Sequence, residues 1–246
     1  MAAAFWASVL AGLATGLGAL PIVFIKKFSH RLRDVLLAFA AGVMVAASAF
    51  NLIVPALDEG SIFSVVSGIL FGALILGLFE RYTPNIDYEK LFGTGDKVAA
   101  KRAMLMIVAL ALHNLPEGLA VGVGFASEAP GMGFALAIAI GVQNAPEGLV
   151  VAASLLDSKL SVWKILGIAT LTGLVEPIAA MLGLALVSYV QAIIPFALAF
   201  AAGAMLYVVF REMIPESHGH GYAEASTASF ILGVVFMIAV NYIFGV

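Results

Sequence analysis

The sequence predicts an all-helical membrane protein in which eight transmembrane helices form a single domain over residues 1–246. Of the 246 residues, 63% are apolar and only 11% are charged, whereas an ordinary soluble domain carries about 25% charged residues. A soluble fold of this length could not bury so much apolar surface, so we expect lipid to be the solvent. Apolar stretches of the ~20 residues that a spanning helix needs recur along the whole chain.

The apolar segments follow one another with short polar gaps between them. They lie at residues 4–25, 34–56, 62–80, 101–126, 131–156, 161–187, 191–214 and 225–246. The longest gap, residues 81–100, is expected to be a loop. We expect the first segment to be a retained helix rather than a cleaved signal peptide, because Lys26 and Lys27 follow it and no basic residue precedes it.

The basic residues indicate the orientation of the chain. All twelve Lys and Arg residues lie in or beside the gaps that follow odd-numbered segments, whereas the charges of the other gaps are the acidic Asp58, Glu59 and Glu128. Basic loops stay in the cytoplasm, so we expect the odd-numbered gaps to face the cytoplasm and both termini to face outward. Cysteine is absent, which excludes disulfides and thiolate ligands, and the net charge of −3 does not suggest a nucleic-acid partner.

An internal repeat links the two ends of the chain. The strongest matches are residues 37–44 with 198–205 and residues 50–55 with 210–215, and weaker ones are 15–17 with 172–174 and 68–71 with 233–236. Segments 1–3 are therefore predicted to recur as segments 6–8 in an inverted, 3+2+3 arrangement, because two intervening helices turn the second copy over. Inverted repeats are typical of secondary transporters with midplane sites. Convergence of Ala-, Gly- and Leu-rich sequence is the alternative explanation.

Two copies of one polar motif lie inside apolar segments. Residues 113–118 read His-Asn-Leu-Pro-Glu-Gly, and residues 143–148 read Gln-Asn-Ala-Pro-Glu-Gly. Each motif is about fifteen residues from the outward turn between segments 4 and 5, which at 1.5 Å per residue is a depth of ~22 Å. Both motifs therefore lie well inside a hydrocarbon core of ~30 Å. Glu176 is about as far into segment 6 and can reach the same level.

The polar residues of each motif share one helix face, because they are three and four residues apart. The candidate ligands at this depth are His113, Asn114, Glu117, Gln143, Asn144, Glu147 and Glu176. Pro116, Pro146 and Pro177 have no N–H, so each frees the carbonyl four residues earlier. Free carbonyls at membrane depth are tolerated where they line a cavity or bind a ligand.

Three carboxylates at one depth in lipid need a cation to neutralise them. Imidazole nitrogen combined with carboxylate and amide oxygens suits zinc, iron(II), manganese or cobalt better than calcium or copper(I). Glu117 and Glu147, one on each helix, could bridge two ions. The sequence thus predicts a midplane site for divalent transition-metal ions.

The paired motif and the Glu-Pro pair at residues 176–177 resemble those of the ZIP (Zrt/Irt-like) metal transporters, most closely the compact prokaryotic members. The likeness covers essentially the whole chain. It implies an integral protein of a prokaryotic inner membrane that moves zinc, or iron, manganese, cadmium or cobalt, toward the cytoplasm as cargo, with no separate cofactor. It is compatible with a homodimer and does not decide the oligomeric state. It also implies an elevator-like slide of helices 1, 4, 5 and 6 against helices 2, 3, 7 and 8.

The resemblance further implies a two-metal site. One metal would be held by His113, Glu117, Gln143 and Glu147, and the other by Asn114, Glu117, Asn144, Glu147 and Glu176. Two departures bear on this set, because many relatives have His where this chain has Gln143, and some have Asp where it has Asn144. One strong and one weak site is therefore the alternative to two equal ones.

A cytoplasmic exit path is a second expectation. The His-rich loop common in the family between helices 3 and 4 is missing, so residues at the 7–8 gap are the candidates to receive the ion. They are Glu212, Glu216, His218 and His220. Capping or an ion pair with Arg211 is the alternative role for the two glutamates, and solvated loop positions are the alternative for the histidines.

Other interpretations of the motif require different chemistry. The carboxylates and His113 could form a structural polar network, and the amides could hydrogen-bond helices together. An intramembrane metalloprotease needs a compact pair such as His-Glu-x-x-His, and His113 is alone at its depth, so no enzymatic activity is expected. A channel-like metal pore would share every ligand, whereas an ion-coupled carrier of organic anions is disfavoured because no Lys or Arg lies at the midplane.

Overall fold

The structure, a computed structural model, describes residues 1–25, 28–81, 111, 114–127, 131–156, 160–189 and 191–244. These residues form eight helical runs, and no strand occurs among them. Six helices are long and apolar enough to cross a membrane, and Ile62–Leu78 is a shorter apolar helix. The prediction of an all-helical membrane protein is therefore confirmed.

The helical runs follow the apolar segments of the sequence. In chain order they are α1 (Ala2–Ala19), α2 (His30–Ala46) continued by α3 (Val54–Glu59), α4 (Ile62–Arg81), an unlabelled helix at residues 114–126, α7 (Met132–Leu155), α8 (Val162–Gly173) continued by α9 (Val175–Tyr189), α10 (Ile194–Val208) continued by α11 (Ile214–His218), and α12 (Ala223–Phe244). The expected loop at 81–100, beyond residue 81, and most of the first half of segment 101–126 lie outside the described residues.

The second helical run begins earlier than the apolar pattern suggested. It starts at His30 rather than near residue 34, because the Ser29 hydroxyl accepts a hydrogen bond of 3.2 Å from the Leu32 N–H and caps the first turn. Asp34 is consequently a helical residue, and it is buried at 2% exposure.

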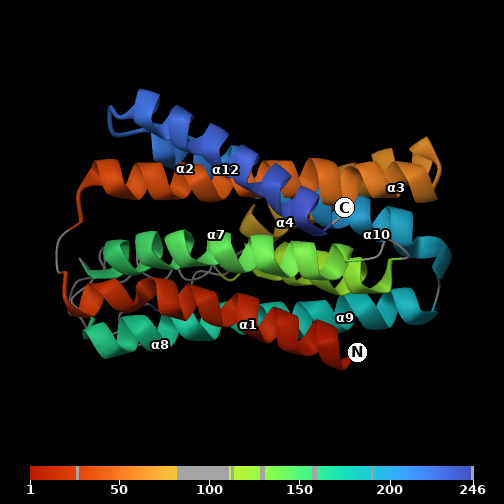
Figure 1. Ribbon diagram of the computed structural model, residues 1–246, viewed down its shortest axis with the longest axis horizontal. Helices are drawn as coiled ribbons and strands as arrows, with labels where there is room; N and C mark the ends of the chain where they lie inside the picture. Colours follow the sequence, from red (N-terminus) through yellow and green to blue (C-terminus); the bar gives the residue numbers. More distant parts are fainter. Residues whose placement is uncertain are drawn as a thin grey trace.

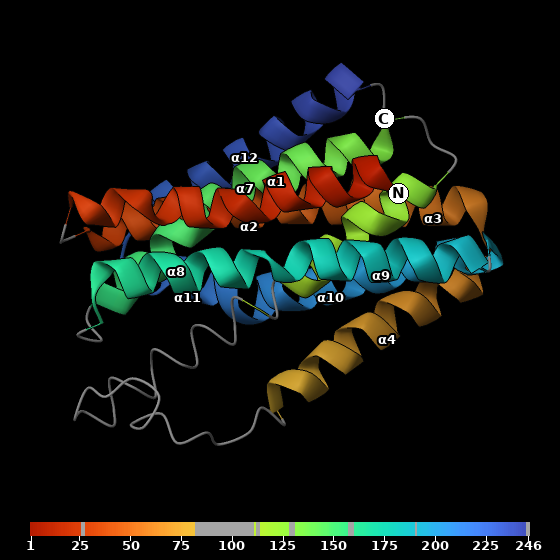
Figure 2. The same ribbon diagram turned by 90° about the horizontal axis from the view of Figure 1, so that it is seen from below.

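The helices form two groups, which Figure 1 shows one above the other. In one group α1 packs on α7, α8 and α9, while in the other α2 packs on α12 and α10 on α4. The helix at 114–126 joins the first group, because a Cβ at its Gly122 would lie 2.0 Å from the Ala180 carbonyl oxygen of α9. The groups meet chiefly where α2 contacts α7. Figure 2 shows α4 at the edge of the molecule, beside α10.

The sixth helical run is broken. α8 ends at Gly173, α9 begins at Val175, and the Leu174 N–H between them donates to the Thr170 carbonyl at 3.2 Å. Pro177 follows directly and cannot donate to the Gly173 carbonyl, which explains why the helix does not continue unbroken. Glu176 therefore lies in the first turn of α9.

Two π-helical segments interrupt the second and seventh runs. They span Ala47–Ile53 and Val209–Met213, and each is followed by a proline, Pro55 or Pro215. A proline removes one helical N–H. A single π turn inside an α-helix is one way in which the backbone hydrogen bonds shift locally.

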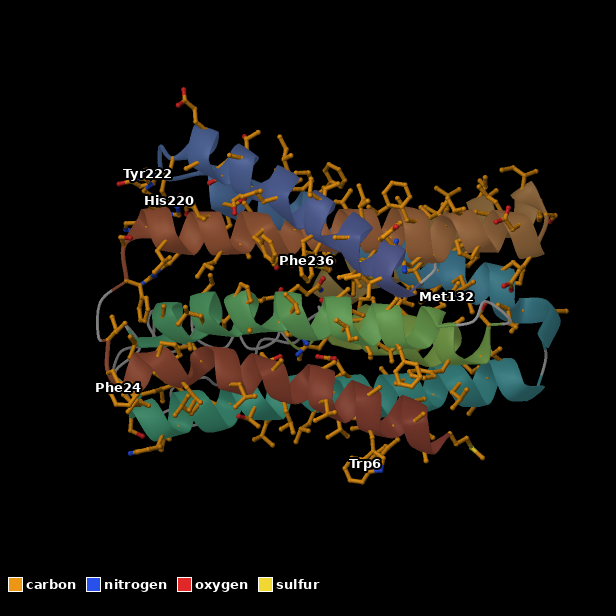
Figure 3. All side chains as sticks on the ribbon, viewed as in Figure 1. Trp6, Phe24, Met132, His220, Tyr222 and Phe236 are labelled. Carbon is orange, nitrogen blue, oxygen red and sulfur yellow. The ribbon has the colours of Figure 1, made fainter. Side chains whose placement is uncertain are left out.

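Large apolar side chains cover much of the surface, as expected for contact with lipid. Trp6 is 61% exposed and Phe24 86% exposed, and both project from the bundle in Figure 3. Met132, at the start of α7, is fully buried. The core between helices is built largely of alanine and glycine, which lets the helix backbones approach closely.

Candidate functional site

A cluster of polar side chains is buried where the helix at 114–126, α7 and α9 come together. Its members are exposed by no more than 2%, and they are Asn114, Glu117, Gln143, Asn144, Glu147 and Glu176. Six of the seven sequence-predicted ligands are thus buried inside the helix bundle. The seventh, His113, lies outside the described residues.

The first contact in this cluster joins the two copies of the motif. The Gln143 side chain on α7 donates a hydrogen bond from Nε2 to Oε1 of Glu117. The second carboxylate oxygen of Glu117 and the amide oxygen of Gln143 have no hydrogen-bond partner among the described residues. Two acceptor atoms from different helices therefore remain available at this point.

The second contact joins α7 to the broken sixth run and to α1. Asn144 Nδ2 donates to Glu176 Oε1 at 2.6 Å and to the Ala11 carbonyl at 3.0 Å. Asn144 Oδ1 and Glu176 Oε2 have no partner within the described chain. This pair repeats the pattern of the first, in which an amide donor holds one carboxylate oxygen and the other oxygen stays unpaired.

Glu147 and Asn114 complete the cluster. Glu147 is 2% exposed and lies on α7 one turn beyond Gln143. Both side-chain amide atoms of Asn114 are buried and have no hydrogen-bond partner among the residues described. A buried amide with neither donor nor acceptor satisfied is costly, which suggests that this position serves a ligand.

Carboxylates alone do not make a metal site in this arrangement. Within the described part of the chain, no group of three or more His, Asp or Glu side chains could hold a metal ion. Amide donors hold Glu117 and Glu176 instead. Among the described residues, the other oxygen donors in the cluster are the side-chain amides of Gln143, Asn144 and Asn114.

The predicted exit residues divide into two kinds. His220 Nδ1 lies 3.0 Å from Asp34 Oδ1, and the His220 ring stacks on His30 with ring centroids 4.6 Å apart. His218 instead hydrogen-bonds locally, with Nδ1 at 3.1 Å from the Ile214 carbonyl. Glu216 is exposed and Glu212 half-buried.

Sequence reasoning missed Asp34 and His30 as neighbours of His220. Asp34 and His220 are 186 positions apart, so no local spacing could have joined them. The only signal in the sequence was that Asp34, an acidic residue, starts an apolar segment directly after a basic gap. A second missed contact is the pair Asn51 and Asn241, whose amides exchange hydrogen bonds of 2.9 and 2.8 Å between the second run and α12.

Comparison with known proteins identifies the family. The family model described as "ZIP Zinc transporter" matches residues 93–241. The chain is 38% identical to the zinc transporter GufA of Myxococcus xanthus, with 100% of both chains covered. It is 37% identical to the zinc transporter ZIPB of Bordetella bronchiseptica, covering 94% of this chain and 78% of that one. It is also 32% identical to the zinc transporter ZupT of Chlorobaculum parvum, over 95% and 94% of the two chains. The chain belongs to the ZIP zinc transporter family.

Proposed function

We propose that this protein binds Zn²⁺ at the buried amide–carboxylate cluster and carries it across the membrane toward the cytoplasm. The single observation that supports this most is the set of unpaired oxygens in the cluster. Glu117 Oε2, Gln143 Oε1, Asn144 Oδ1 and Glu176 Oε2 come from three helical runs and have no hydrogen-bond partner among the described residues. Buried acceptors of this kind need a cation or a donor. Iron(II), manganese, cadmium and cobalt are further candidate cargoes.

The ligands divide into two groups. His113, Glu117, Gln143 and Glu147 hold one ion, and Asn114, Glu117, Asn144, Glu147 and Glu176 hold the second. The two observed amide–carboxylate contacts fall one in each group, which supports the division. Only the first group contains an imidazole, so it binds zinc more strongly than the second.

Paired close contacts support an inverted repeat. A Cβ at Gly42 of α2 would lie 2.0 Å from the Phe230 carbonyl oxygen of α12, and one at Gly203 of α10 would lie 2.1 Å from that of Ile69 in α4. Gly42 and Gly203 occupy matched positions in the sequence repeat. The pair α2–α12 thus corresponds to the pair α10–α4, as an inverted 3+2+3 arrangement requires.

The same contacts favour a register of the third and eighth helices that the sequence match did not suggest. Gly72 approaches the carbonyl of Phe200, and Gly233 approaches that of Phe39, while Phe39 and Phe200 are matched in the repeat. Gly233 thus corresponds to Gly72 rather than to Gly68, a difference of one helical turn. Each half also contains one of the π-helical segments that precede Pro55 and Pro215.

We expect an elevator mechanism, which the grouping of the helices supports. α1, α7, α8 and α9 pack on one another, as do α2 with α12 and α4 with α10, and the six candidate ligands among the described residues belong to the first group. That group slides with its ion against the other. The N- and C-terminal ends both lie in the right half of Figure 1, whereas His220 is at the left end in Figure 3. With both termini outward, the ion leaves toward His220 and Asp34.

Zinc uptake into proteoliposomes tests this function. We expect saturable uptake by the wild type, competition by other divalent ions, and loss of uptake in Glu147→Ala and His113→Ala while both variants remain folded and inserted. Normal uptake by Glu147→Ala would show that the cluster is not the zinc-binding site. Uptake that rises linearly with zinc concentration would favour a channel-like pore, and competition by organic anions would favour an ion-coupled carrier of another substrate.

A further inference from the structure

Thr15 of α1 is buried beside the proposed site but takes part in none of its contacts. It is 1% exposed, and its hydroxyl has no hydrogen-bond partner among the described residues. Another hydroxyl on α1 and one on the neighbouring α8 behave differently. Ser8 donates to the Ala4 carbonyl at 2.8 Å, and Thr172 donates to the Ala169 carbonyl at 2.9 Å.

The reason lies in the carbonyl that Thr15 would normally use. A helical threonine donates to the carbonyl three or four residues earlier, which for the second spacing is that of Ala11. This carbonyl already accepts the hydrogen bond of 3.0 Å from Asn144 Nδ2. Asn144 and Thr15 are therefore competing donors for one acceptor, and in this structure Asn144 occupies it.

Thr15 also lies against two of the three helical runs that bear the candidate ligands, namely α7 and the run formed by α8 and α9. A Cβ at Gly148, next to Glu147, would lie 2.1 Å from the Thr15 carbonyl oxygen, and one at Gly173 would lie 3.1 Å from the Thr15 hydroxyl. Its position mirrors that of Glu176, because a Cβ at Gly118 in the other copy of the motif would lie 2.4 Å from the Glu176 carbonyl oxygen. Where one half of the molecule has a carboxylate, the other has this hydroxyl.

We propose that Thr15 is a positioning residue that releases Asn144 to the cargo ion. This inference rests on the proposed function. To share a cation with Glu176, Asn144 must turn Oδ1 toward it, and Nδ2 then leaves both Glu176 and the Ala11 carbonyl. The Ala11 carbonyl keeps the helical N–H of Thr15 as a donor. The Thr15 hydroxyl rotates into the place of Nδ2 on that carbonyl and gains the hydrogen-bond partner that it lacks. The Thr15 hydrogen bond to the Ala11 carbonyl therefore forms when the ion binds.

Isothermal titration of Zn²⁺ into the detergent-purified protein tests the exchange. Thr15→Val keeps the shape but removes the hydroxyl, so we expect zinc to bind about tenfold more weakly at the site that contains Asn144, because the bound state loses one hydrogen bond. Thr15→Ser restores the hydroxyl and should bind as the wild type does. Ser8→Ala is the matched control, because it removes a buried hydroxyl of the same helix that bonds only within α1.

The outcomes separate this inference from the proposed function. Wild-type affinity in Thr15→Val, with the weaker zinc-binding event lost in Glu176→Gln, would overturn the role of Thr15 and leave the site intact. Equal weakening in Thr15→Val and Thr15→Ser would also overturn it, because packing rather than the hydroxyl would then matter. Two unchanged zinc-binding events in Glu176→Gln would instead count against the proposed second ion site. Gel filtration and thermal unfolding of each variant verify that it is folded.

Discussion

At the scale of single residues, the site consists of acids held by amides rather than by cations. Gln143 donates to Glu117 and Asn144 to Glu176. An amide has both a donor and an acceptor, so the same side chain can stabilise a carboxylate and, after turning, contribute an oxygen to a metal ion. This double use explains why amides rather than aspartates suit these two positions.

Gln143→His should change metal preference as well as affinity. A second imidazole nitrogen favours zinc over manganese, which prefers oxygen ligands. We expect zinc to bind about tenfold more tightly, with manganese little changed. Competition between the two metals in a titration measures this ratio, and an unaltered ratio would show that residue 143 does not touch the ion.

Asn144→Asp should make stability depend on the metal. The change removes the donor to Glu176 and Ala11 and sets two carboxylates together. Without metal the variant should unfold at a lower temperature than the wild type. Zinc should raise its unfolding temperature by more than it raises that of the wild type, because the ion binds the folded state alone. Unfolding in detergent with chelator and with zinc tests this expectation.

At the scale of elements, helix contacts depend on glycine where two backbones meet. A Cβ at Gly173 of α8 would lie 2.0 Å from the Gly12 carbonyl oxygen, and a Cβ at Gly12 would lie 2.1 Å from that of Gly173. The contact is reciprocal, so α1 and α8 cannot accept even a methyl group here without moving apart. Glu176 lies three residues after Gly173, so this contact also fixes the position of that candidate ligand.

Gly173→Ala should therefore destabilise the protein by several kcal/mol, about the cost of overpacking a tight core. Gly167→Ala in the same helix is the matched control, because a Cβ there would meet no heavy atom of the described residues within 4 Å. The control should be neutral, or more stable by up to about 1 kcal/mol. Thermal unfolding of both variants compares them, and equal stability would mean that the α1–α8 contact is looser than described.

The sequence predicted some of these features and not others. Hydropathy alone gave the helical class, and the equal depth of the two motifs gave the meeting of Glu117 with Gln143. The break at Leu174 was signalled only by Pro177, which frees a carbonyl without saying whether the helix bends or stops. The contact of Asp34 with His220 needed the tertiary fold. The match of Gly68 with Gly233 stays a prediction, because residues rich in Gly and Leu align equally well at neighbouring turns.

At the scale of the whole molecule, at least two polar contacts between described residues cross from one helix group to the other. Arg33 Nη2 of α2 donates to the Ala153 carbonyl of α7 at 3.3 Å. Near the opposite end, the Ser127 hydroxyl donates to Glu59 Oε1 at 2.9 Å. A slide of one group by even a few ångströms would break both contacts, so both are specific to the conformation described here.

Cross-linking the groups should stop transport if they slide. The chain has no cysteine, so Glu59→Cys with Ser127→Cys introduces a unique thiol pair. Joining the pair with a short bifunctional thiol reagent should abolish zinc uptake, and a reducing agent should restore it. Asn51→Cys with Asn241→Cys is the control, because those residues pair within one group. Full uptake by the cross-linked Glu59–Ser127 pair would exclude sliding and favour a pore.

The break in the sixth helical run bears on how the proposed carrier returns across the membrane without its ion. A helix that starts at Val175 presents its first N–H groups, and about half a positive charge, to the side chain of Glu176 in its first turn. An unbroken helix would offer no such partial charge at this depth. In the proposed carrier, the amino end of α9 therefore acts as a counter-charge for Glu176, so that the empty site can recross the membrane without a bare carboxylate.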